Sequence, residues 1–578
     1  MSNVCPSARV ENLLPPGGTR AVPLRATIAS LVVSAALVAV PFSPAGAQSN
    51  AGGRSEVFAG SELESYLRYI QTAGKSPSYT WSIRGFSPSE VDGLASSDAR
   101  HPWAARYSLG RQTRSGFTWD YIRPTLGFSV NSAYPFGGND GVVWTGKGLT
   151  TTFQAGIAGR YGPFSVTLAP VAFRAENQSF PLLANGLSGR LRFADGQFPY
   201  RIDRPQRFGT QPYTRIDLGE STLRVDVAGI GAGVSTASQW WGPTTVYPYV
   251  LGNNAGGFPH AFVGTSRPAN IGIGSLHGRL VYGTLDQSPY STVVGADFFE
   301  NFDLPGKKRF MAGLVGVAQI RGVRGLEIGG TRFFHASNPE SGISSENLKL
   351  PLQNVFKRRL DAEDTVVLGD NTSLRENQLA SLFFRWAPPA SGFEVFGEYG
   401  REDFAADLRD LLLEPDHAAT MNLGFRKAWL GPTVMNAVRG EVFTFEASAG
   451  TRTRGEGAIY LHAPLRQGHT NRGQMLGANV GPGSGSAQMF AVDRFTTKGR
   501  MTGFVSRVTN REVQTPGYVT GPEIDRPVDV QNSIGAELAR FIGPFDVTGK
   551  AALTSNLNRN FRGDRVNGSL ALVVRQDF

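Results

Sequence analysis

Apart from its first 47 residues, the sequence contains no cysteine and no long apolar run. The single cysteine, Cys5, lies in that leading segment, so a chain that loses the segment has no disulfide or thiolate chemistry. Without a stretch of about 18 apolar residues, the rest of the chain is not expected to cross a membrane with helices. The seven histidines form no HExxH pair and no cluster with ligand spacing. We therefore expect neither a metal site nor a cofactor.

The leading segment itself has the features of an export signal. Arg20 and Arg25 supply positive charge, residues 27–40 are apolar, and Ala45-Gly46-Ala47 provides small residues for cleavage. The apolar run is shorter than the roughly 20 residues that a membrane-spanning helix needs. We expect removal of residues 1–47; an uncleaved amphipathic anchor is the alternative.

Catalytic motifs are also missing. Residues 141–147 have the spacing of a phosphate loop, but Gly148 stands where Ser or Thr would bind magnesium. No zinc-finger spacing or polybasic arm accompanies the net charge of +10, which suits acidic glycans or lipid phosphates better than nucleic acid. We predict that the chain is not an enzyme, although a hydrolase site assembled across strands stays open as an alternative.

What the chain does contain is alternation of apolar and polar residues in short runs. Residues 223–227 and 545–553 are examples; in the first, Leu223 and Val225 flank Arg224. Successive side chains of a strand point to opposite faces, so each run has one apolar and one polar side. This pattern fits a soluble sandwich as well as a membrane barrel.

The chain end and the turns favour the barrel. Phe578 follows an alternating segment with Leu570 and Leu572, which is typical of the signal that the outer-membrane barrel-assembly machinery recognises. Residues 160–164 and 541–545 share a tight Gly-Pro turn flanked by aromatic side chains. Long polar connections, residues 336–370 and 467–488, contrast with these short turns, as expected of such barrels.

We predict an all-β fold: a large antiparallel transmembrane β-barrel of about 16 to 18 strands over residues 113–578. At that size the lumen can hold water, in which inward charges such as Glu398 and Lys550 would lie. Outer-membrane lipid would surround the barrel, which places the exported protein in the outer membrane.

Residues 48–112 are predicted to form a small N-terminal helical segment in the periplasm. Residues 61–73 have Leu63, Leu67 and Ile70 on one helical face. A second helix would begin at Ser87, with Glu90 completing a capping box. This segment is expected to plug or flank the mouth of the barrel.

Several stretches combine aromatic, amide and basic side chains. They are Trp240-Trp241-Gly242-Pro243, residues 253–260, 265–268, 376–379, 392–398 and 408–417, Arg466-Gln467-Gly468-His469-Thr470-Asn471-Arg472-Gly473-Gln474, and residues 481–484. Together they resemble the Wzi family of outer-membrane capsule-assembly lectins, over about residues 61–578. The resemblance implies a barrel that binds capsular polysaccharide, or another acidic surface polysaccharide, and helps to retain it on the cell.

The residue types suit a glycan site. Indole rings stack on sugar faces, amides pair with vicinal hydroxyls, and arginines hold a uronate carboxylate. The candidate polysaccharide-binding residues are Trp240, Trp241, Asn253, Asn254, His260, Arg267, Gln467, His469, Asn471 and Arg472. The alternative for any one of them is a structural role, in an interface belt, a loop or a lumen ion pair. For the whole chain, the alternative function is a porin or uptake channel.

Overall fold

The computed structural model describes residues 57–87, 90–91, 94, 100–107, 116–292, 308–337, 343, 345–352, 376–402, 407–446, 448, 458–462, 465–512 and 528–576. The predicted export signal and the terminal Phe578 lie outside these residues. All of the described residues belong to one compact unit.

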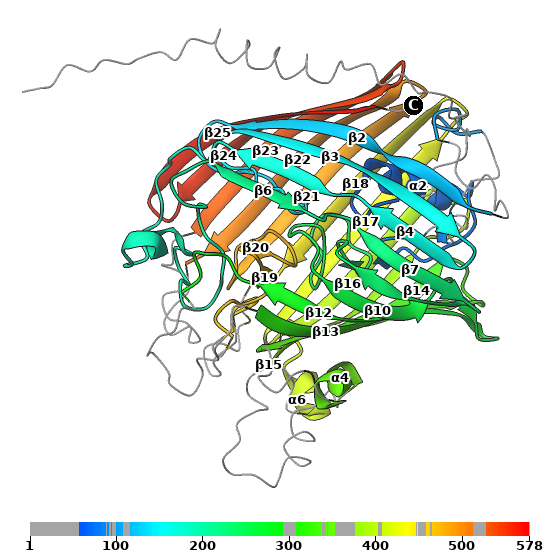
Figure 1. Ribbon diagram of the computed structural model, residues 1–578, viewed down its shortest axis with the longest axis horizontal. Coiled ribbons are helices and arrows are strands. Elements are labelled where there is room, and N and C mark those ends of the chain that lie inside the picture. The colour runs from blue at the N-terminus through cyan, green and yellow to red at the C-terminus, as the bar shows by residue number, and fades with distance from the viewer. Residues whose placement is uncertain are drawn as a thin grey trace, which may run out of the picture. The chain divides into compact units, whose positions relative to one another are not determined.

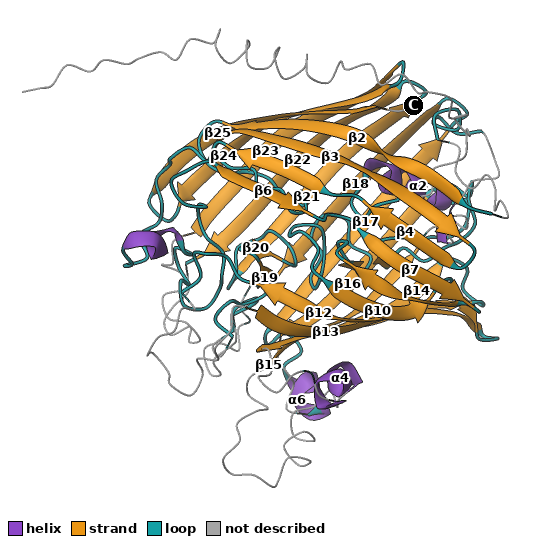
Figure 2. Ribbon diagram, in the orientation of Figure 1, coloured by secondary structure: helices purple, strands orange, loops and turns teal. Residues whose placement is uncertain are grey.

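The wall of this unit is a closed antiparallel barrel of 18 strands, which confirms the predicted fold class (Figure 1). Each strand pairs with its neighbours in the chain, and β25 pairs with β2 to close the ring. Three strands of the wall are interrupted and consist of two pieces each, namely β4 with β5, β6 with β7, and β10 with β11. Figure 2 shows how little of the molecule is helical.

The strands of the barrel wall have the following bounds: β2 (Thr118–Asn131), β3 (Gly148–Tyr161), β4 (Phe164–Leu168), β5 (Val171–Ala175), β6 (Tyr213–Asp217), β7 (Thr222–Val227), β8 (Ile230–Ser235), β10 (His260–Thr265), β11 (Ala269–Asn270), β12 (Gly274–Asp286), β13 (Lys308–Ile320), β14 (Leu326–Ser337), β15 (Glu376–Trp386), β16 (Phe393–Glu402), β17 (Ala419–Leu430), β18 (Val434–Thr444), β21 (Gly485–Thr496), β22 (Gly499–Arg511), β23 (Val528–Ile542), β24 (Phe545–Arg559) and β25 (Gly563–Gln576).

Smaller elements occupy the lumen and the connections. They are α2 (Glu62–Thr72), β1 (Ile83–Arg84), η1 (Gly189–Phe193), β9 (Trp240–Trp241), α4 (Ser345–Lys349), η2 (Leu350–Leu352), α6 (Leu408–Leu413), β19 (Thr470–Asn471) and β20 (Gln474–Met475). Among the described residues, no helix has the length and hydropathy needed to cross a membrane.

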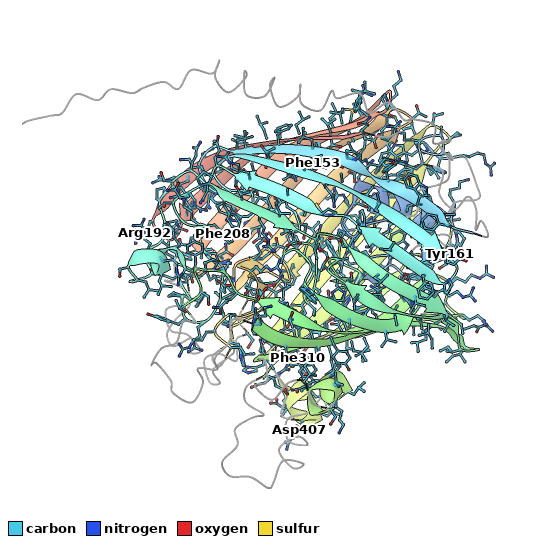
Figure 3. All side chains as sticks on the ribbon, viewed as in Figure 1. Phe153, Tyr161, Arg192, Phe208, Phe310 and Asp407 are labelled. Atoms are coloured by element: carbon cyan, nitrogen blue, oxygen red, sulfur yellow. The ribbon has the colours of Figure 1, made fainter. Side chains whose placement is uncertain are left out.

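The alternation of the strands sorts side chains between two faces as predicted. Leu223 and Val227 are exposed on the outside of β7, whereas Arg224 and Asp226 form an ion pair on its inner face at 2.8 Å. On β3, Phe153 and Tyr161 are likewise exposed (Figure 3). Exposed large apolar side chains of this kind occur on strands all around the ring, among them Ile328, Leu382, Leu423, Val492, Val505, Ile534, Leu553 and Leu570.

The two ends of the barrel differ, as the sequence predicts. Short turns join β3 to β4 and β23 to β24 at one end, and Gly162 and Gly543 in these turns both have φ 55°, which favours glycine. Exposed aromatic side chains gather near this end: Trp119, Tyr121, Tyr161, Phe164, Trp386, Phe393, Trp429 and Phe545. Long connections lie at the other end. We call these the short-turn end and the long-loop end.

The N-terminal segment fills the short-turn end of the lumen. Ser61 caps α2 by accepting a hydrogen bond from the Glu64 amide at 3.2 Å, and the predicted apolar side chains are buried. The polar side of the helix is buried too, because Tyr69 donates to Asp493 on β21 at 3.0 Å and Arg68 contacts Glu394 on β16. The segment therefore plugs the barrel instead of flanking it.

The capping box predicted at Ser87 is present. The Ser87 amide donates to the Glu90 carboxylate at 2.8 Å, and the Glu90 amide donates back to the Ser87 hydroxyl at 3.3 Å. Glu90 also lies 3.1 Å from His277 on β12, so this box attaches the N-terminal segment to the wall.

Charges on the inner face meet less open space than predicted. Arg385 on β15 bridges Glu327 at 2.6 Å and Glu394 at 2.7 Å, and all three side chains are almost completely buried beside α2. Glu398 is buried as well, whereas Lys550 is about half exposed and lies 3.3 Å from Glu537. The expectation of a water-filled lumen is therefore wrong for the layer around α2, since the plug occupies that space.

Candidate functional site

Two connections from the long-loop end fold back into the lumen and interlock there. Residues 236–259 join β8 to β10, and residues 445–484 join β18 to β21. Gly252 donates its amide to the Leu476 carbonyl at 3.0 Å, and the Tyr460 hydroxyl donates to the Tyr249 carbonyl at 2.7 Å. The second connection includes most of residues 467–488, which the sequence predicts to be a long polar connection, and its described part lies within the lumen.

Trp240 and Trp241 lie at the root of this internal layer. They form β9, which pairs with β1 of the N-terminal segment, and the Arg84 guanidinium stacks 3.8 Å from the centre of the Trp240 ring. Trp241 packs in the main hydrophobic core of the lumen. Both indoles are completely buried, so in this conformation neither offers a face to a sugar.

The predicted amide residues tie the connections together. Asn254 donates to the Met475 carbonyl at 3.1 Å, and Asn471 donates to the Gly256 carbonyl at 3.3 Å. Asn253 donates to the Asn139 carbonyl at 3.2 Å. Gln467 reaches Gln287 at 3.0 Å. Each of these amides therefore donates to another connection within the lumen.

His469 is the most enclosed of the predicted residues. Its Nε2 donates to the Val250 carbonyl at 2.6 Å, and its ring stacks on Tyr460 with 5.3 Å between centroids. Burial lowers the pKa of His469 to about 3, and the Arg309 charge contributes, although the hydrogen bond to Val250 opposes the shift. The imidazole is thus neutral at physiological pH.

The remaining predicted residues divide between the lumen and the rim. Arg472 forms an ion pair with Asp217 at 2.7 Å and stays partly exposed. His260 is buried at the start of β10, where its ring nitrogen meets the Phe258 carbonyl at 2.7 Å. Arg267 is exposed between β10 and β11 at the short-turn end, so the fold does not bring it to the other nine.

Above the interlocked connections lies a cavity of about 510 Å³, which we call the upper cavity. It reaches the long-loop end, where the β24–β25 turn with Phe561 borders it. Nine amide side chains line it: Asn139, Gln197, Gln206, Asn254, Gln474, Asn479, Asn510, Gln531 and Asn560. Trp144 and Tyr247 add aromatic surface, and Trp144 is itself held edge-on against Phe208 at 5.1 Å. Such a lining offers many hydrogen-bond donors and acceptors next to flat apolar rings.

The charges of the upper cavity are largely balanced. Arg439 pairs with Asp493 at 3.0 Å, Arg204 pairs with Asp195 at 2.8 Å, and Lys550 pairs with Glu537. Three of the four cations in the lining therefore have an acidic partner, and the fourth, Arg559, lies 3.8 Å from the centre of the Tyr134 ring. The cavity offers hydroxyl recognition more than a site of net positive charge.

A second cavity of about 530 Å³, the lower cavity, extends toward the short-turn end. Its wall includes Asn253, Asp217 and Tyr107. Asn139, Asp140 and Val143 border both cavities, so the connection between β2 and β3 forms the partition between them.

Sequence patterns did not identify the upper cavity. Of the ten candidates only Asn254 lines it, and Gln474 ends a block that the sequence singles out. Asn510 and Gln531 sit on inner faces of β22 and β23, where alternation marks them as polar and inward but gives no sign of what they face. The lining comes from segments hundreds of residues apart, and no local spacing encodes it.

Comparison with known proteins identifies the fold. No family model matches the sequence, and no curated protein matches it. The structure is similar to Wzi, an outer-membrane protein of Escherichia coli involved in group 1 capsule assembly and described as a carbohydrate-binding β-barrel. That match has a TM-score of 0.57 at 12% identity, over 90% of this chain and 100% of that one. The barrel expected from the sequence resemblance is thus shown.

Two porins are more distant. OccK7 of Pseudomonas aeruginosa has a TM-score of 0.36 at 10% identity, over 79% of this chain and 98% of its own. A BenF-like porin of Pseudomonas fluorescens Pf-5 has a TM-score of 0.34 at 9% identity, over 80% and 99%. Similarity at this level does not bear on function.

Proposed function

We propose that this chain is an outer-membrane barrel that binds carbohydrate in the upper cavity and helps to assemble or retain capsular or other surface polysaccharide on the cell. The observation that carries the proposal is the lining of that cavity by nine amides together with Trp144 and Tyr247. Amides pair with vicinal hydroxyls, and aromatic rings pack on sugar C–H faces. The capsule protein with a similar fold, described as carbohydrate-binding, supports the same reading.

Within this proposal the ten residues predicted from the sequence take different roles. Asn254 contacts the polymer directly. The buried members, including Trp240, Trp241 and His469, hold the two connections in place and so shape the cavity floor. Asn253 lines the lower cavity, and Arg472 pairs with Asp217 in the wall of that cavity. Arg267 lies at the short-turn end, away from both.

The chemistry of the polymer follows from the charges. Because three of the four cavity cations are paired, the contacts there are made mainly with hydroxyl groups, and the net charge of +8 that remains without residues 1–47 draws an acidic polymer to the surface. A long polymer that engages several weak contacts is retained by multivalency, and no catalytic step is needed. The short-turn end faces the periplasm, and export and insertion use the N-terminal signal and Phe578.

Binding of purified surface polysaccharide to the detergent-solubilised barrel tests the cavity. A neutral hydrogen bond contributes about 0.5–1.5 kcal/mol, so the double change Asn510→Ala and Gln531→Ala is expected to weaken binding about tenfold. Gln211→Ala removes an exposed amide outside the cavity and is the matched control. Equal binding by all three proteins would remove the upper cavity from consideration.

A test in cells addresses the biological role. Deletion is expected to release polymer into the medium while its synthesis continues, and the double cavity variant is expected to release part of it. Polymer that stays attached in the deletion strain would contradict a role in retention.

A second candidate function, passage of small solutes, has one observation in its favour. The two cavities share a partition formed by Asn139, Asp140 and Val143, so the lumen is not solidly filled along this side. Planar-bilayer conductance separates the candidates, because a plugged binding protein passes little current. Steady channel currents from the unaltered protein would favour the uptake role.

A further inference from the structure

Five exposed leucines occur on two connections at the long-loop end. Leu348 and Leu352 belong to α4 and η2, between β14 and β15; Leu408, Leu412 and Leu413 belong to α6, between β16 and β17. Leu352, Leu412 and Leu413 are each about 70% exposed, at 69%, 71% and 68%. We call these five residues the leucine rim. Exposed leucines that lie this close together in the chain are typical of a surface that contacts a membrane or another protein.

The first of the two connections packs on the outside of the barrel. Met311, Val315 and Val317 of β13 point into the lumen core, so Phe310 and Ala312 point outward. Leu350 of η2 is buried against Phe310, Ala312 and Phe334, and the outward Tyr282 hydroxyl donates to the Leu348 carbonyl at 2.6 Å. Figure 3 labels Phe310 beside this connection. In Figure 1, α4 and α6 lie outside the wall strands, at the bottom of the view.

The second connection covers the same outer face farther around the ring. Tyr399 alternates with the inward Glu398 on β16, so it points outward. Its hydroxyl donates to the Pro415 carbonyl just after α6. Both connections therefore turn back over the outside of the wall, and their leucines face away from it.

Two arginines beneath these connections explain why the wall is covered there. Arg332, Ala380 and Arg401 stand opposite one another in a single outward row across β14, β15 and β16. Arg332 donates to the Pro351 carbonyl at 3.3 Å and to Gln378, and Arg401 donates to the Glu414 carbonyl at 3.4 Å. A charge facing lipid costs about 2–4 kcal/mol at the membrane midplane, so backbone carbonyls over the two guanidiniums keep them out of contact with lipid.

The apolar belt begins directly below this arginine row. Leu382 lies two residues from Ala380 on β15, about 7 Å along the strand, and it is 69% exposed. In the row that follows, exposed Ile328 stands opposite exposed Phe384, and exposed Leu423 lies in the same row beyond Gly397. The leucine rim therefore continues a lipid-facing surface at its boundary.

We propose that the leucine rim inserts into the membrane leaflet on the long-loop side and contacts lipid acyl chains. α4, η2 and α6 act as shallow interfacial anchors that hold their connections flat on the membrane. This leaves the mouth of the upper cavity uncovered on that side of the ring. The inference rests on the membrane location that is part of the proposed function.

Fluorescence quenching from within the bilayer tests the proposal. In a Cys5→Ser background, Leu352→Cys and Leu412→Cys each carry a single environment-sensitive fluorophore, and the barrel is reconstituted in phosphatidylcholine vesicles with brominated acyl chains. We expect both probes to be quenched by bromine and protected from aqueous iodide. Leu570→Cys in the apolar belt is the positive control, and Ser188→Cys, exposed in the connection between β5 and β6, is the aqueous control.

The outcomes are distinct. Quenching at Leu570 but not at Leu352 and Leu412 overturns the proposal while leaving the membrane barrel intact. A Leu570 probe that also escapes bromine contradicts the membrane location itself. Probes at the rim that are shielded from both quenchers indicate a protein cover, such as a second copy of this chain, and equally overturn it.

Discussion

At the scale of single residues, the best-defined charges lie between the N-terminal plug and the wall. Arg385 holds the carboxylates of Glu327 and Glu394, and Arg68 of α2 supplies Glu394 with a second cation. Buried charges are stable only while each keeps its partner. This cluster therefore makes the plug and the wall depend on one another.

Arg385→Met is expected to lower the free energy of unfolding by about 3–5 kcal/mol, because it leaves buried carboxylates without their shared cation. Urea unfolding in detergent or lipid, followed by tryptophan fluorescence, measures the change. Arg190→Met, at an exposed position in η1, is the matched control and should stay within about 0.5 kcal/mol. Similar small losses in both variants would mean that the cluster adds little.

His469 predicts a pH dependence of stability. Its folded pKa is about 3, below the ordinary 6.5, so the unfolded chain binds the proton more readily between those values. The contribution of the neutral His469 to the free energy of unfolding is complete above about pH 6.5 and is lost as the pH falls toward 3. The free energy of unfolding then falls by up to about 1.4 kcal/mol per pH unit.

His469→Gln should flatten that slope in unfolding measurements taken between pH 7 and pH 4. Tyr460→Phe keeps the ring that stacks on His469 and removes only the neighbouring hydrogen bond from the Tyr460 hydroxyl to the Tyr249 carbonyl, so it should lower stability without changing the slope. A slope that is unchanged in His469→Gln would assign the pH dependence to other groups.

At the scale of elements, the connection between β2 and β3 divides the lumen. Asn139 adopts φ 60° and contacts the connection between β8 and β10 through Asn253 and Val246. Replacing residues 138–141 with two glycines is expected to join the two cavities and to raise single-channel conductance from near zero to a measurable current. Shortening the exposed turn 321–324 at the short-turn end is the control and should leave the single-channel conductance near zero. If the variant folds but does not conduct, the N-terminal segment closes the lumen without the connection between β2 and β3.

The elements of the wall were predictable and the elements of the lumen were not. Period-two alternation identified runs such as residues 223–227, because the outer face of each strand carries apolar side chains and the inner face carries the polar side chains of the lumen. The capping box at Ser87 also carried local information. The interruptions between β4 and β5 and between β6 and β7 fall at Pro170 and Gly219, which break a strand, but these residues do not show that the chain resumes the same strand of the wall.

The candidate site shows the limit more sharply. Trp240, Asn254 and His469 were singled out together, and the fold does bring them into one internal layer. Whether such residues face a ligand or one another depends on contacts such as that of His469 with Val250, 219 residues away in the chain. A polar connection that folds inward has the same composition as one that extends into water.

At the scale of the whole molecule, the apolar belt gives a direct test of the membrane barrel. Ile534 is exposed near the middle of β23. Ile534→Arg is expected to cost about 2–4 kcal/mol of folding free energy in bilayers, whereas an exposed substitution in a soluble protein changes stability by about 0.5 kcal/mol or less. Ile273→Arg, in the exposed turn between β11 and β12, should cost at most about 1 kcal/mol. Equal, small costs at both sites would argue that no lipid surrounds β23.

The N-terminal segment also touches the strands that complete the ring. Arg106 forms an ion pair with Asp546 on β24, and the Tyr107 hydroxyl contacts both Asp546 and Arg575 on β25. Residues 106 and 107 are thus held by the last two strands, and β25 pairs with β2 to close the ring. Because a closed wall surrounds the N-terminal segment, that segment has to enter the lumen before β25 and β2 finish pairing or while they do so.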